Sequence, residues 1–262
     1  MSQNNIWFGY FSSFEQAGFS TACSCRFHGE SDLVPGTLNL ALHVGDNPRK
    51  VLRNRVKFAE AIGVDPGRFT TCAQVHGSNV KVVTEDLIGS GAFSFADTIP
   101  ETDALVTNLA DVPLLLFYAD CVPVLLADPL TGAVGLAHAG WRGTAAQIAK
   151  KTVRAMTDAF GVKPENLLAA IGPSIGDCCY EVDDVVKNGM PGYANCFMAK
   201  CDGKYWLNLW KVNRQQLLEA GVASSKITVA GICTNHNPEL FCSYRYENGK
   251  TGRMGVCLCR KG

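Results

Sequence analysis

The chain has 262 residues, 47% of them hydrophobic, which is enough to bury a sizeable core in one large domain or two small ones. Lysine plus arginine and aspartate plus glutamate number 24 each, so no overall charge favours nucleic acid or an anionic membrane surface. We therefore expect one domain over residues 1–262 and a small-molecule partner.

The N-terminal residues lack a basic segment followed by an apolar one, and no apolar run approaches the roughly 20 residues that span a bilayer. These features favour a cytoplasmic protein. Because disulfides are uncommon in that compartment, we expect the 12 cysteines to be reduced and mostly to serve as small core residues.

The first clear helix is expected after Pro48, with Asp46 or Asn47 as its N-cap and Gly63 at its end. Further helices are expected from Thr144 onward, at 183–188 and at 210–220. Strands are expected at 69–75, 80–83, 102–107, 112–118, 122–127, 133–137, 167–171, 226–231 and 254–259. Because strands follow one another in some places and alternate with helices in others, the pattern favours an α+β fold with mixed sheets.

Residues 119–144 carry the densest group of reactive side chains. Two apolar strands flank the turn-forming segment 128–132, which predicts a β-hairpin. Cys121 comes just before the first strand and His138 just after the second. Strand pairing should therefore bring a thiol and an imidazole together at the open end of the hairpin.

His76 is expected at a strand end or turn, where it can join Cys121 and His138. Thiolate and imidazole groups are good ligands for zinc or copper, and three protein ligands with an open fourth position are typical of a catalytic zinc site. The alternative is that these residues are unrelated in space. Asp120 is a candidate general base or a partner of a metal ligand.

Arginine residues could bind an anion near this site. Arg142 lies beside the expected helix start near Thr144, where free backbone amides favour a phosphate, although an ordinary helix start with a solvated arginine is equally compatible. Arg245 and Arg253 could add donors for phosphate or carboxylate. Residues 249–251 resemble part of a phosphate-binding loop, but the first glycine of that motif is absent.

Two further patterns are weaker. Residues 172–176 match the G-x-S-x-G elbow of serine hydrolases, with Ser174 as nucleophile, but Pro173 and the following sequence favour a simple tight turn. Cys233 and His236 invite a metal interpretation. Because the chain has no C-x-x-C pair, we expect Cys233 in the core and His236 on the surface.

Several motifs together resemble the laccase-domain purine nucleoside phosphorylases, a family also labelled multicopper polyphenol oxidase and peptidoglycan editing factor. The similarity spans nearly the whole chain, and it is carried by Asn39-Leu40, Val44-Gly45-Asp46, Asn54-Arg55, Gln74-Val75-His76-Gly77, Thr102-Asp103-Ala104-Leu105, Ala119-Asp120-Cys121-Val122-Pro123-Val124, His138-Ala139-Gly140-Trp141-Arg142-Gly143, Ile171-Gly172-Pro173, Cys179-Tyr180-Glu181-Val182 and Thr251-Gly252-Arg253. Residues 22–30 depart from the family pattern.

The resemblance implies a cytoplasmic metalloenzyme with one α/β/β/α sandwich-like domain and zinc, with copper as the alternative, bound by His76, Cys121 and His138. It implies phosphate-dependent cleavage of adenosine, inosine or methylthioadenosine, with adenosine deamination as a side activity. Catalytic roles then fall to Asp120 and Arg142, and phosphate or ribose contacts to Arg55, Arg245 and Arg253.

A non-catalytic editing role in peptidoglycan precursor quality control is an alternative. Five histidines are too few for a coupled multicopper centre, so only weak copper-dependent oxidation is compatible with the sequence.

Overall fold

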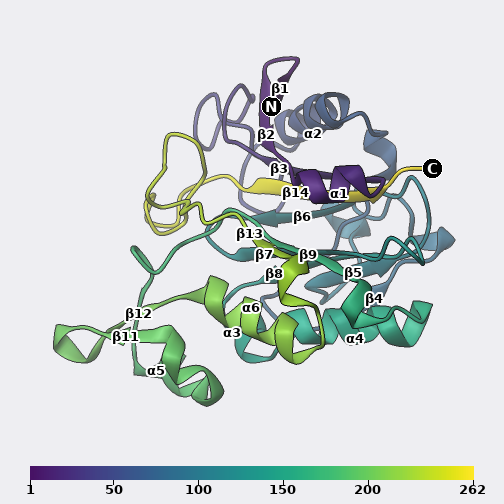
Figure 1. Ribbon diagram of the computed structural model, residues 1–262. Helices are drawn as coiled ribbons and strands as arrows, with labels where there is room; N and C mark the ends of the chain where they lie inside the picture. Colours follow the sequence, from purple (N-terminus) through teal and green to yellow (C-terminus); the bar gives the residue numbers. More distant parts are fainter.

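Apolar strands pair into two large sheets that face each other (Figure 1), in a computed structural model that describes residues 1–262 apart from the side chain of Gln3. The five-stranded sheet has the order β1-β2-β3-β14-β6 and pairs antiparallel. The six-stranded sheet has the order β13-β9-β7-β8-β5-β4 and is mixed, because β13–β9 and β4–β5 are parallel pairs. A small third sheet has the order β10-β12-β11.

The strands have the following bounds: β1 Ser2–Gln3, β2 Ile6–Gly9, β3 Phe19–Ser24, β4 Val80–Val82, β5 Ala104–Thr107, β6 Leu114–Tyr118, β7 Val122–Ala127, β8 Val134–Ala139, β9 Leu168–Ile171, β10 Glu181–Val182, β11 Phe197–Ala199, β12 Tyr205–Leu207, β13 Ile227–Val229 and β14 Met254–Arg260. The α-helices are α1 Ser12–Gln16, α2 Pro48–Ile62, α3 Trp141–Ala145, α4 Ile148–Phe160, α5 Asp184–Asn188 and α6 Leu209–Glu219. Short 3-10 helices lie at Pro66–Arg68, Glu85–Leu87, Phe95–Asp97, Pro164–Asn166, Pro191–Cys196, Cys201–Gly203 and Ser224–Lys226.

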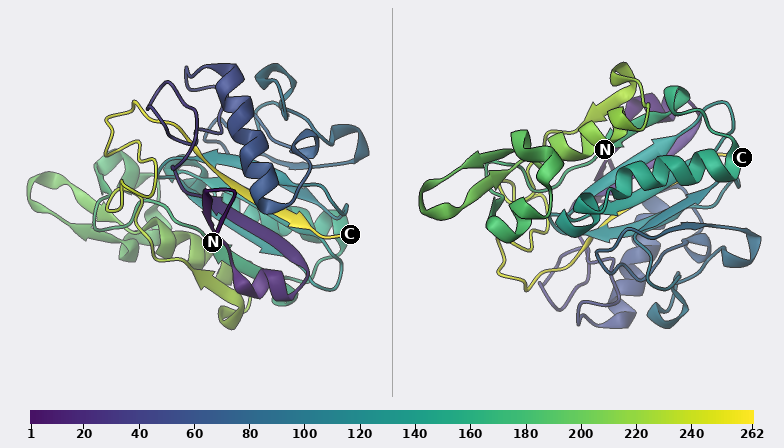
Figure 2. Two further views of the ribbon diagram at one scale, coloured as in Figure 1. Left: turned by 90° about the horizontal axis from the view of Figure 1, so that it is seen from above. Right: turned by 90° about the horizontal axis from the view of Figure 1, so that it is seen from below.

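Helices cover the outer faces of the two large sheets. Helix α2 packs against β1, β2 and β3, whereas α4 packs against β4, β5 and β8, and α6 against β7 and β9. The two faces are seen from above and below in Figure 2. The layers therefore run α/β/β/α, and the α+β fold class with mixed sheets expected from the sequence is confirmed.

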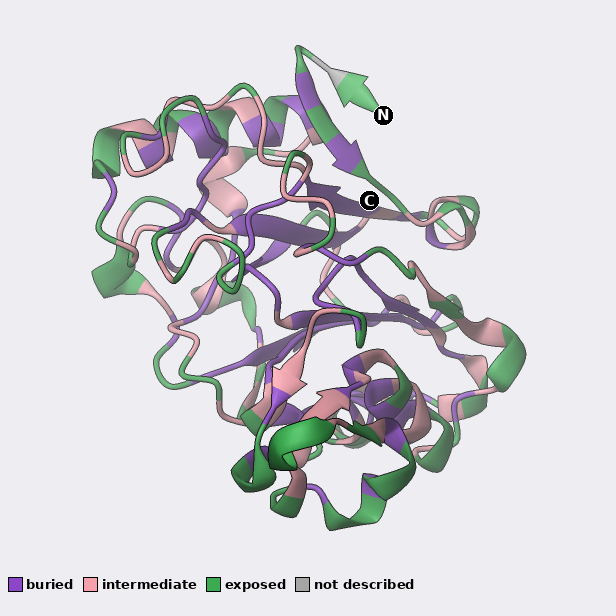
Figure 3. Ribbon diagram, turned by 90° about the vertical axis from the view of Figure 1, so that its left-hand side faces the viewer, coloured by how far each residue is buried: buried purple, intermediate pink, exposed green. Residues whose placement is uncertain are grey.

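Apolar side chains fill the spaces between these layers. Leu116 and Leu258 of the five-stranded sheet meet Leu125 and Leu136 of the six-stranded sheet in one buried cluster, and the strands form the buried centre of Figure 3. The outer helices carry their exposed residues on the side away from the sheets. This core fixes how the edges of the two sheets are placed, and the candidate site lies at the end of the β7–β8 hairpin.

Leu136→Ala is expected to lower the free energy of unfolding by about 2–5 kcal/mol, because the leucine is fully buried between the sheets and its loss leaves a cavity. The matched control is Leu130→Ala in the hairpin turn, where the side chain is 77% exposed and the expected change is within about 0.5 kcal/mol. Urea unfolding of both variants measures the difference. Equal losses would contradict the layered core.

Several local predictions are confirmed and two are wrong. Helix α2 starts after Asn47, whose side chain accepts the N–H of Arg49 at 3.1 Å, and ends at Gly63, as expected. Thr144 does not begin a helix: α3 starts earlier, and Gln147, with φ of 62°, separates it from α4. The expected strand at 69–75 forms only isolated bridges with neighbouring strands.

All 12 cysteines are free in the structure, as expected. Among the described residues, every helix is too short or too polar to cross a bilayer. The expected cytoplasmic location stays a prediction.

Candidate metal centre

The β7–β8 hairpin brings Cys121 and His138 together. The two strands pair antiparallel with Pro123 opposite His138, so Cys121, which directly precedes β7, lies beside the end of β8. His138 lies within β8 and not after it, because the strand extends to Ala139. His76, from the loop before β4, completes the group, and one ligand atom from each of the three residues lies within 4.8 Å of the others. We call His76, Cys121 and His138 the triad.

The triad is enclosed on one side and accessible on the other. His138 is only 4% exposed, Cys121 is half-buried and His76 is exposed. The two imidazole rings are arranged edge to face, with centroids 4.9 Å apart. A three-ligand set with one accessible side fits a metal ion that keeps a coordination position for substrate.

A buried carboxylate that the sequence analysis did not assign to the site, Asp103, holds two of the three triad residues. One of its oxygens lies 3.0 Å from Nδ1 of His138, which leaves Nε2 as the ligand atom. The same carboxylate accepts the backbone N–H groups of Val75, His76 and Gly77 at 3.2, 3.0 and 2.7 Å. Such a partner fixes the tautomer and orientation of a metal-binding histidine.

The charges of the triad favour a thiolate. Burial alone would raise the pKa of the Cys121 thiol, but the positive charge of His138 and hydrogen bonds from His138 and His76 lower it to about 6. Burial would lower the pKa of His138, but the negative charge of Cys121 and the bond to Asp103 raise it to about 9. The metal-free site therefore holds a thiolate–imidazolium pair at neutral pH, and a cation can replace the imidazolium proton.

Asp103→Asn is expected to weaken zinc binding by roughly 10–100-fold, because a neutral amide is a weaker acceptor for the His138 ring and for the three amides around His76. Competition with a chromogenic chelator measures the affinity. Asp97→Asn, at an exposed position, is the control. Equal affinities in the two variants would show that Asp103 does not support the ligands.

In metal-free protein, alkylation of Cys121 by iodoacetamide is expected to rise with pH around a midpoint near 6, because its pKa is lowered to about 6. The thiolate is lost as pH falls below that value and persists above it. A synthetic peptide of residues 116–126 is the reference, and its midpoint should lie near 8.5, the ordinary cysteine value. Mass spectrometry of the modified peptide gives both curves, and coincident midpoints would contradict the charge pair.

The carboxylate of Asp120 is occupied by hydrogen bonds to the C-terminal loops, so it is not free to act as a general base in this structure. It accepts the hydroxyl of Thr234 at 2.6 Å, the hydroxyl of Ser243 at 3.0 Å and the backbone N–H of Arg245 at 2.7 Å. Its own φ is 83°. These contacts tie the C-terminal loops to the residue next to Cys121, so Asp120 positions the site, and its expected catalytic role stays a prediction.

Two of the expected phosphate-binding arginines lie at the surface beside the triad. Arg245 donates to the carbonyl of Glu181 at 3.1 Å and lies over the ring of Tyr180. Arg142 lies within α3, not ahead of a helix, and stacks on Trp141 at 4.5 Å. Burial and the negative charge of Cys121 raise the pKa of Tyr180, whereas Arg245 and Arg142 oppose that rise. Arg245, Arg142 and Cys121 therefore all lie close to Tyr180.

Arg253 and a histidine that the sequence analysis did not assign, His43, also lie near the triad, close enough for the charge of Cys121 to act on Arg253 and that of His138 to act on His43. Burial lowers the pKa of Arg253, while the negative charges of Cys121 and Asp120 oppose the shift. Partial enclosure and the positive charges of Arg253 and Arg55 lower the pKa of His43 to about 4. At neutral pH His43 is therefore an uncharged group beside a cationic one.

Arg55 is buried, unlike Arg142, Arg245 and Arg253. It is 2% exposed, and its guanidinium donates to the carbonyls of Leu40, Gly91 and Ala92 at 2.8, 2.6 and 2.7 Å. These bonds join α2 to two loops. We therefore leave Arg55 out of the proposed ligand set, and its expected phosphate contact stays a prediction.

Ser174 is fully buried and has no histidine among its hydrogen-bond partners in the described structure. Its hydroxyl donates to the carbonyl of Gly172 at 3.1 Å and accepts the indole N–H of Trp210 at 2.7 Å. A serine nucleophile needs access to substrate and an adjacent base. The structure therefore favours the simple turn over the serine hydrolase interpretation.

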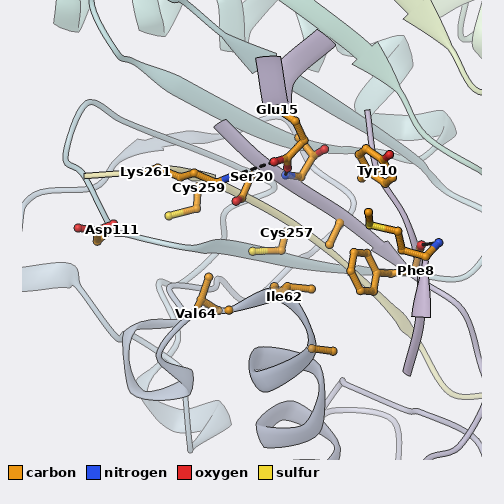
Figure 4. Close-up of a pocket in the computed structure, with 15 residues that line it drawn as sticks. Phe8, Tyr10, Glu15, Ser20, Ile62, Val64, Asp111, Cys257, Cys259 and Lys261 are labelled. Carbon is orange, nitrogen blue, oxygen red and sulfur yellow. Dashed lines mark hydrogen bonds and ion pairs between the residues drawn. The ribbon is translucent and has the colours of Figure 1, made fainter. Parts of the chain in front are cut away.

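A pocket of about 530 Å³ lies elsewhere, between the five-stranded sheet and the C-terminal end of α2 (Figure 4). Its 15 lining residues include Phe8, Tyr10, Ile62 and Cys257, but none of the three triad residues. Its walls carry an ion pair between Glu15 and Lys261 at 2.8 Å, but no cluster of potential metal ligands among the described residues. The triad, and not this pocket, therefore carries the candidate metal chemistry.

A two-sheet sandwich with an accessible His-Cys-His set at the end of one hairpin defines a class of candidate metalloproteins. Within that class the chain belongs to the multi-copper polyphenol oxidoreductase laccase family, whose family model matches residues 20–261. The predicted family membership is confirmed.

Curated relatives and solved structures agree with this assignment. The chain is 42% identical to purine nucleoside phosphorylase YlmD of Geobacillus stearothermophilus, over 94% of this chain and 91% of that protein. It is 32% identical to a purine nucleoside phosphorylase of Bacteroides thetaiotaomicron, over 94% and 93%. The crystal structure of YfiH from Bacillus licheniformis matches with a TM-score of 0.94 and 35% identity, covering 99% of this chain and 100% of that one. The crystal structure of YlmD matches with a TM-score of 0.91 and 40% identity, covering 94% and 93%.

Proposed function

We propose that this chain is a zinc-dependent purine nucleoside phosphorylase that converts adenosine, inosine or methylthioadenosine and phosphate to the free base and a sugar 1-phosphate. The convergence of His76, Cys121 and His138 at an accessible edge carries the proposal. The names of the relatives at 42% and 32% identity support the reaction class. Deamination of adenosine is proposed as a side activity of the same site.

The ligand atoms of the triad fit zinc. Two imidazole nitrogens and one thiolate are typical of sites that keep a fourth position for substrate, and the lowered pKa of Cys121 supplies the thiolate at neutral pH. Copper is the second candidate because it accepts the same ligands. When bound, such an ion supplies a Lewis acid that polarises a phosphate or sugar oxygen and activates water.

The chain's own residues would bind and orient the reactants. Arg253 and Arg245 offer planar donors for the phosphate, and Arg142 adds a third positive charge. In phosphorolysis a phosphate oxygen forms a bond to C1′ of the sugar while the glycosidic C–N bond breaks, and the base takes up a proton. These guanidinium groups would hold the phosphate against the sugar, which is the positioning that this displacement needs.

Incubation of metal-quantified protein with inosine, with and without phosphate, tests the proposal. We expect hypoxanthine and ribose 1-phosphate to form only when phosphate is present, and inosine to form from adenosine in a parallel sample. Zinc-loaded protein that yields no free base from any of the three nucleosides would exclude phosphorolysis. Binding without turnover would favour the editing-factor alternative.

The family description favours one second candidate, copper-dependent oxidation of polyphenols. The triad uses two of the five histidines in the chain, whereas a coupled copper cluster needs many more imidazoles. We therefore expect copper-loaded protein to oxidise a phenolic dye far more slowly than zinc-loaded protein cleaves inosine. The opposite ratio would support the oxidase.

A further inference from the structure

A second group of soft metal ligands lies apart from the triad. Cys178 and Cys179 follow the turn after β9, and Cys233 follows β13. Their sulfur atoms all lie within 4.8 Å of one another, and the Sγ atoms of Cys178 and Cys179 are 3.6 Å apart. We call these three residues the three-thiol cluster. The sequence suggests a metal role for Cys233 only with His236 and places Cys233 in the core; it does not connect Cys233 with Cys178 and Cys179, which lie more than 50 residues earlier in the chain.

The backbone holds the three-thiol cluster together. A parallel bridge sets Ser174 opposite Cys233: Ser174 N–H donates to the carbonyl of Ile232 at 3.1 Å, and Thr234 N–H donates to the carbonyl of Ser174 at 3.1 Å. Gly176 leaves the necessary space, since a Cβ there would lie 2.9 Å from the Trp210 ring and 3.3 Å from the sulfur of Cys178. The sulfurs therefore meet because of the fold and not because of flexible side chains alone.

We infer that the three-thiol cluster is a second metal site, which takes a thiophilic ion of the zinc or copper(I) class. With zinc–sulfur bonds of about 2.3 Å, a tetrahedral ion separates its sulfurs by about 3.8 Å, which matches the Cys178–Cys179 spacing. Nδ1 of His236 lies 4.0 Å from the sulfur of Cys179, although His236 is outside the group of ligand atoms that lie within 4.8 Å of one another, so its ring would have to move inward to become a fourth ligand. With that movement, three thiolates and one imidazole would form a closed set, which is typical of structural zinc.

Two further features suit a metal-bound thiolate. The backbone N–H of Gly176 donates to the sulfur of Cys233 at 3.2 Å, and such bonds stabilise charge on a ligating sulfur. Cys233 is buried, whereas Cys178 is exposed, so an ion can enter from solvent. The cluster thus has both an anchored inner ligand and an accessible outer one.

The second site is linked to the first through one carboxylate. Thr234, next to Cys233, donates its hydroxyl to Asp120 at 2.6 Å, and Asp120 precedes Cys121. An ion at the three-thiol cluster would therefore hold the loop that supports the triad, without contacting substrate. This inference does not depend on the proposed phosphorolysis, because metal binding at the cluster requires no turnover.

Cobalt(II) binding to Cys121→Ser protein tests the inference, because this background removes one triad ligand. We expect about one equivalent of cobalt to remain bound, with the intense sulfur-to-cobalt charge-transfer band of a site with several thiolates. Adding Cys178→Ser and Cys179→Ser should abolish the band. Adding Cys201→Ser, at an exposed cysteine outside both groups, should leave it unchanged. Competition with a zinc chelator and with a copper(I) chelator then shows which ion binds more tightly.

A second measurement keeps the inference testable if the multiple variants fold poorly. In the unmodified chain, zinc should protect Cys178 and Cys179 from iodoacetamide but leave Cys201 reactive, as read by mass spectrometry under reducing conditions. Equal labelling of Cys178 and Cys179 with and without zinc, or a cobalt spectrum that survives their replacement, would overturn the second site. Loss of phosphorolysis alone would not bear on it.

Discussion

Cys121→Ser is expected to lower both the zinc affinity of the triad and nucleoside phosphorolysis by at least about 100-fold. The substitution replaces the thiolate of the triad with a hydroxyl, which stays protonated near neutral pH and binds zinc poorly. Loss of a ligand should exceed the roughly 10–100-fold effect that is typical of losing a partner of a ligand. Metal analysis of purified protein, in which the metal of the three-thiol cluster should remain, and an inosine assay measure the two losses together.

Cys201→Ser is the control for this experiment, since Cys201 is exposed and lies outside the triad. Circular dichroism and thermal unfolding confirm that both variants fold. Full zinc occupancy with lost activity would make Cys121 a catalytic group and not a ligand. Unchanged occupancy and activity would remove Cys121 from the site altogether.

Gly140→Ala is expected to lower metal affinity and activity by about tenfold, although it adds only one methyl group. A Cβ at this position would lie 3.0 Å from the sulfur of Cys121 and 3.1 Å from Cδ2 of His76, so both ligands must move. The φ of Gly140 is −65°, which alanine adopts freely, so the effect is steric. A displacement of about 1 Å can cost about 100-fold in rate, and a smaller movement should cost less.

Gly192→Ala is the matched control, because a Cβ there meets no other atom within 4 Å. Chelator competition and the inosine assay compare the two variants. If they behave alike, the space beside Gly140 has no bearing on the ligands, and the packing of the triad must be more tolerant than its distances suggest.

Much of the fold could be predicted from local patterns. The cap and first turn of α2, the β7–β8 hairpin and the positions of most strands along the chain follow from residue spacing and turn chemistry. The start near Thr144 could not be placed, because the break at Gln147 depends on how α3 packs against β8 and α6. Local propensity also cannot show that segment 69–75 touches its neighbours only at isolated bridges.

Only the part of the site that depends on local structure could be predicted from the sequence. Two triad residues are joined by one hairpin, so their meeting follows from strand pairing. The resemblance motif 102–105 contains Asp103, but its role depends on contacts to a loop 26 to 28 residues away. His43 and the three-thiol cluster depend on segments even further apart, and no spacing within one element signals them.

The carboxylate of Asp103 also affects the conformational entropy that the chain loses when it binds a metal ion. Ordering a backbone residue costs about 1–2 kcal/mol of conformational entropy. Here the left-handed turn at His76 is already fixed by bonds to Asp103 when the chain folds. Metal binding therefore has little loop ordering left to do, so the triad is preorganised for its ion, and capture should have a small entropic penalty.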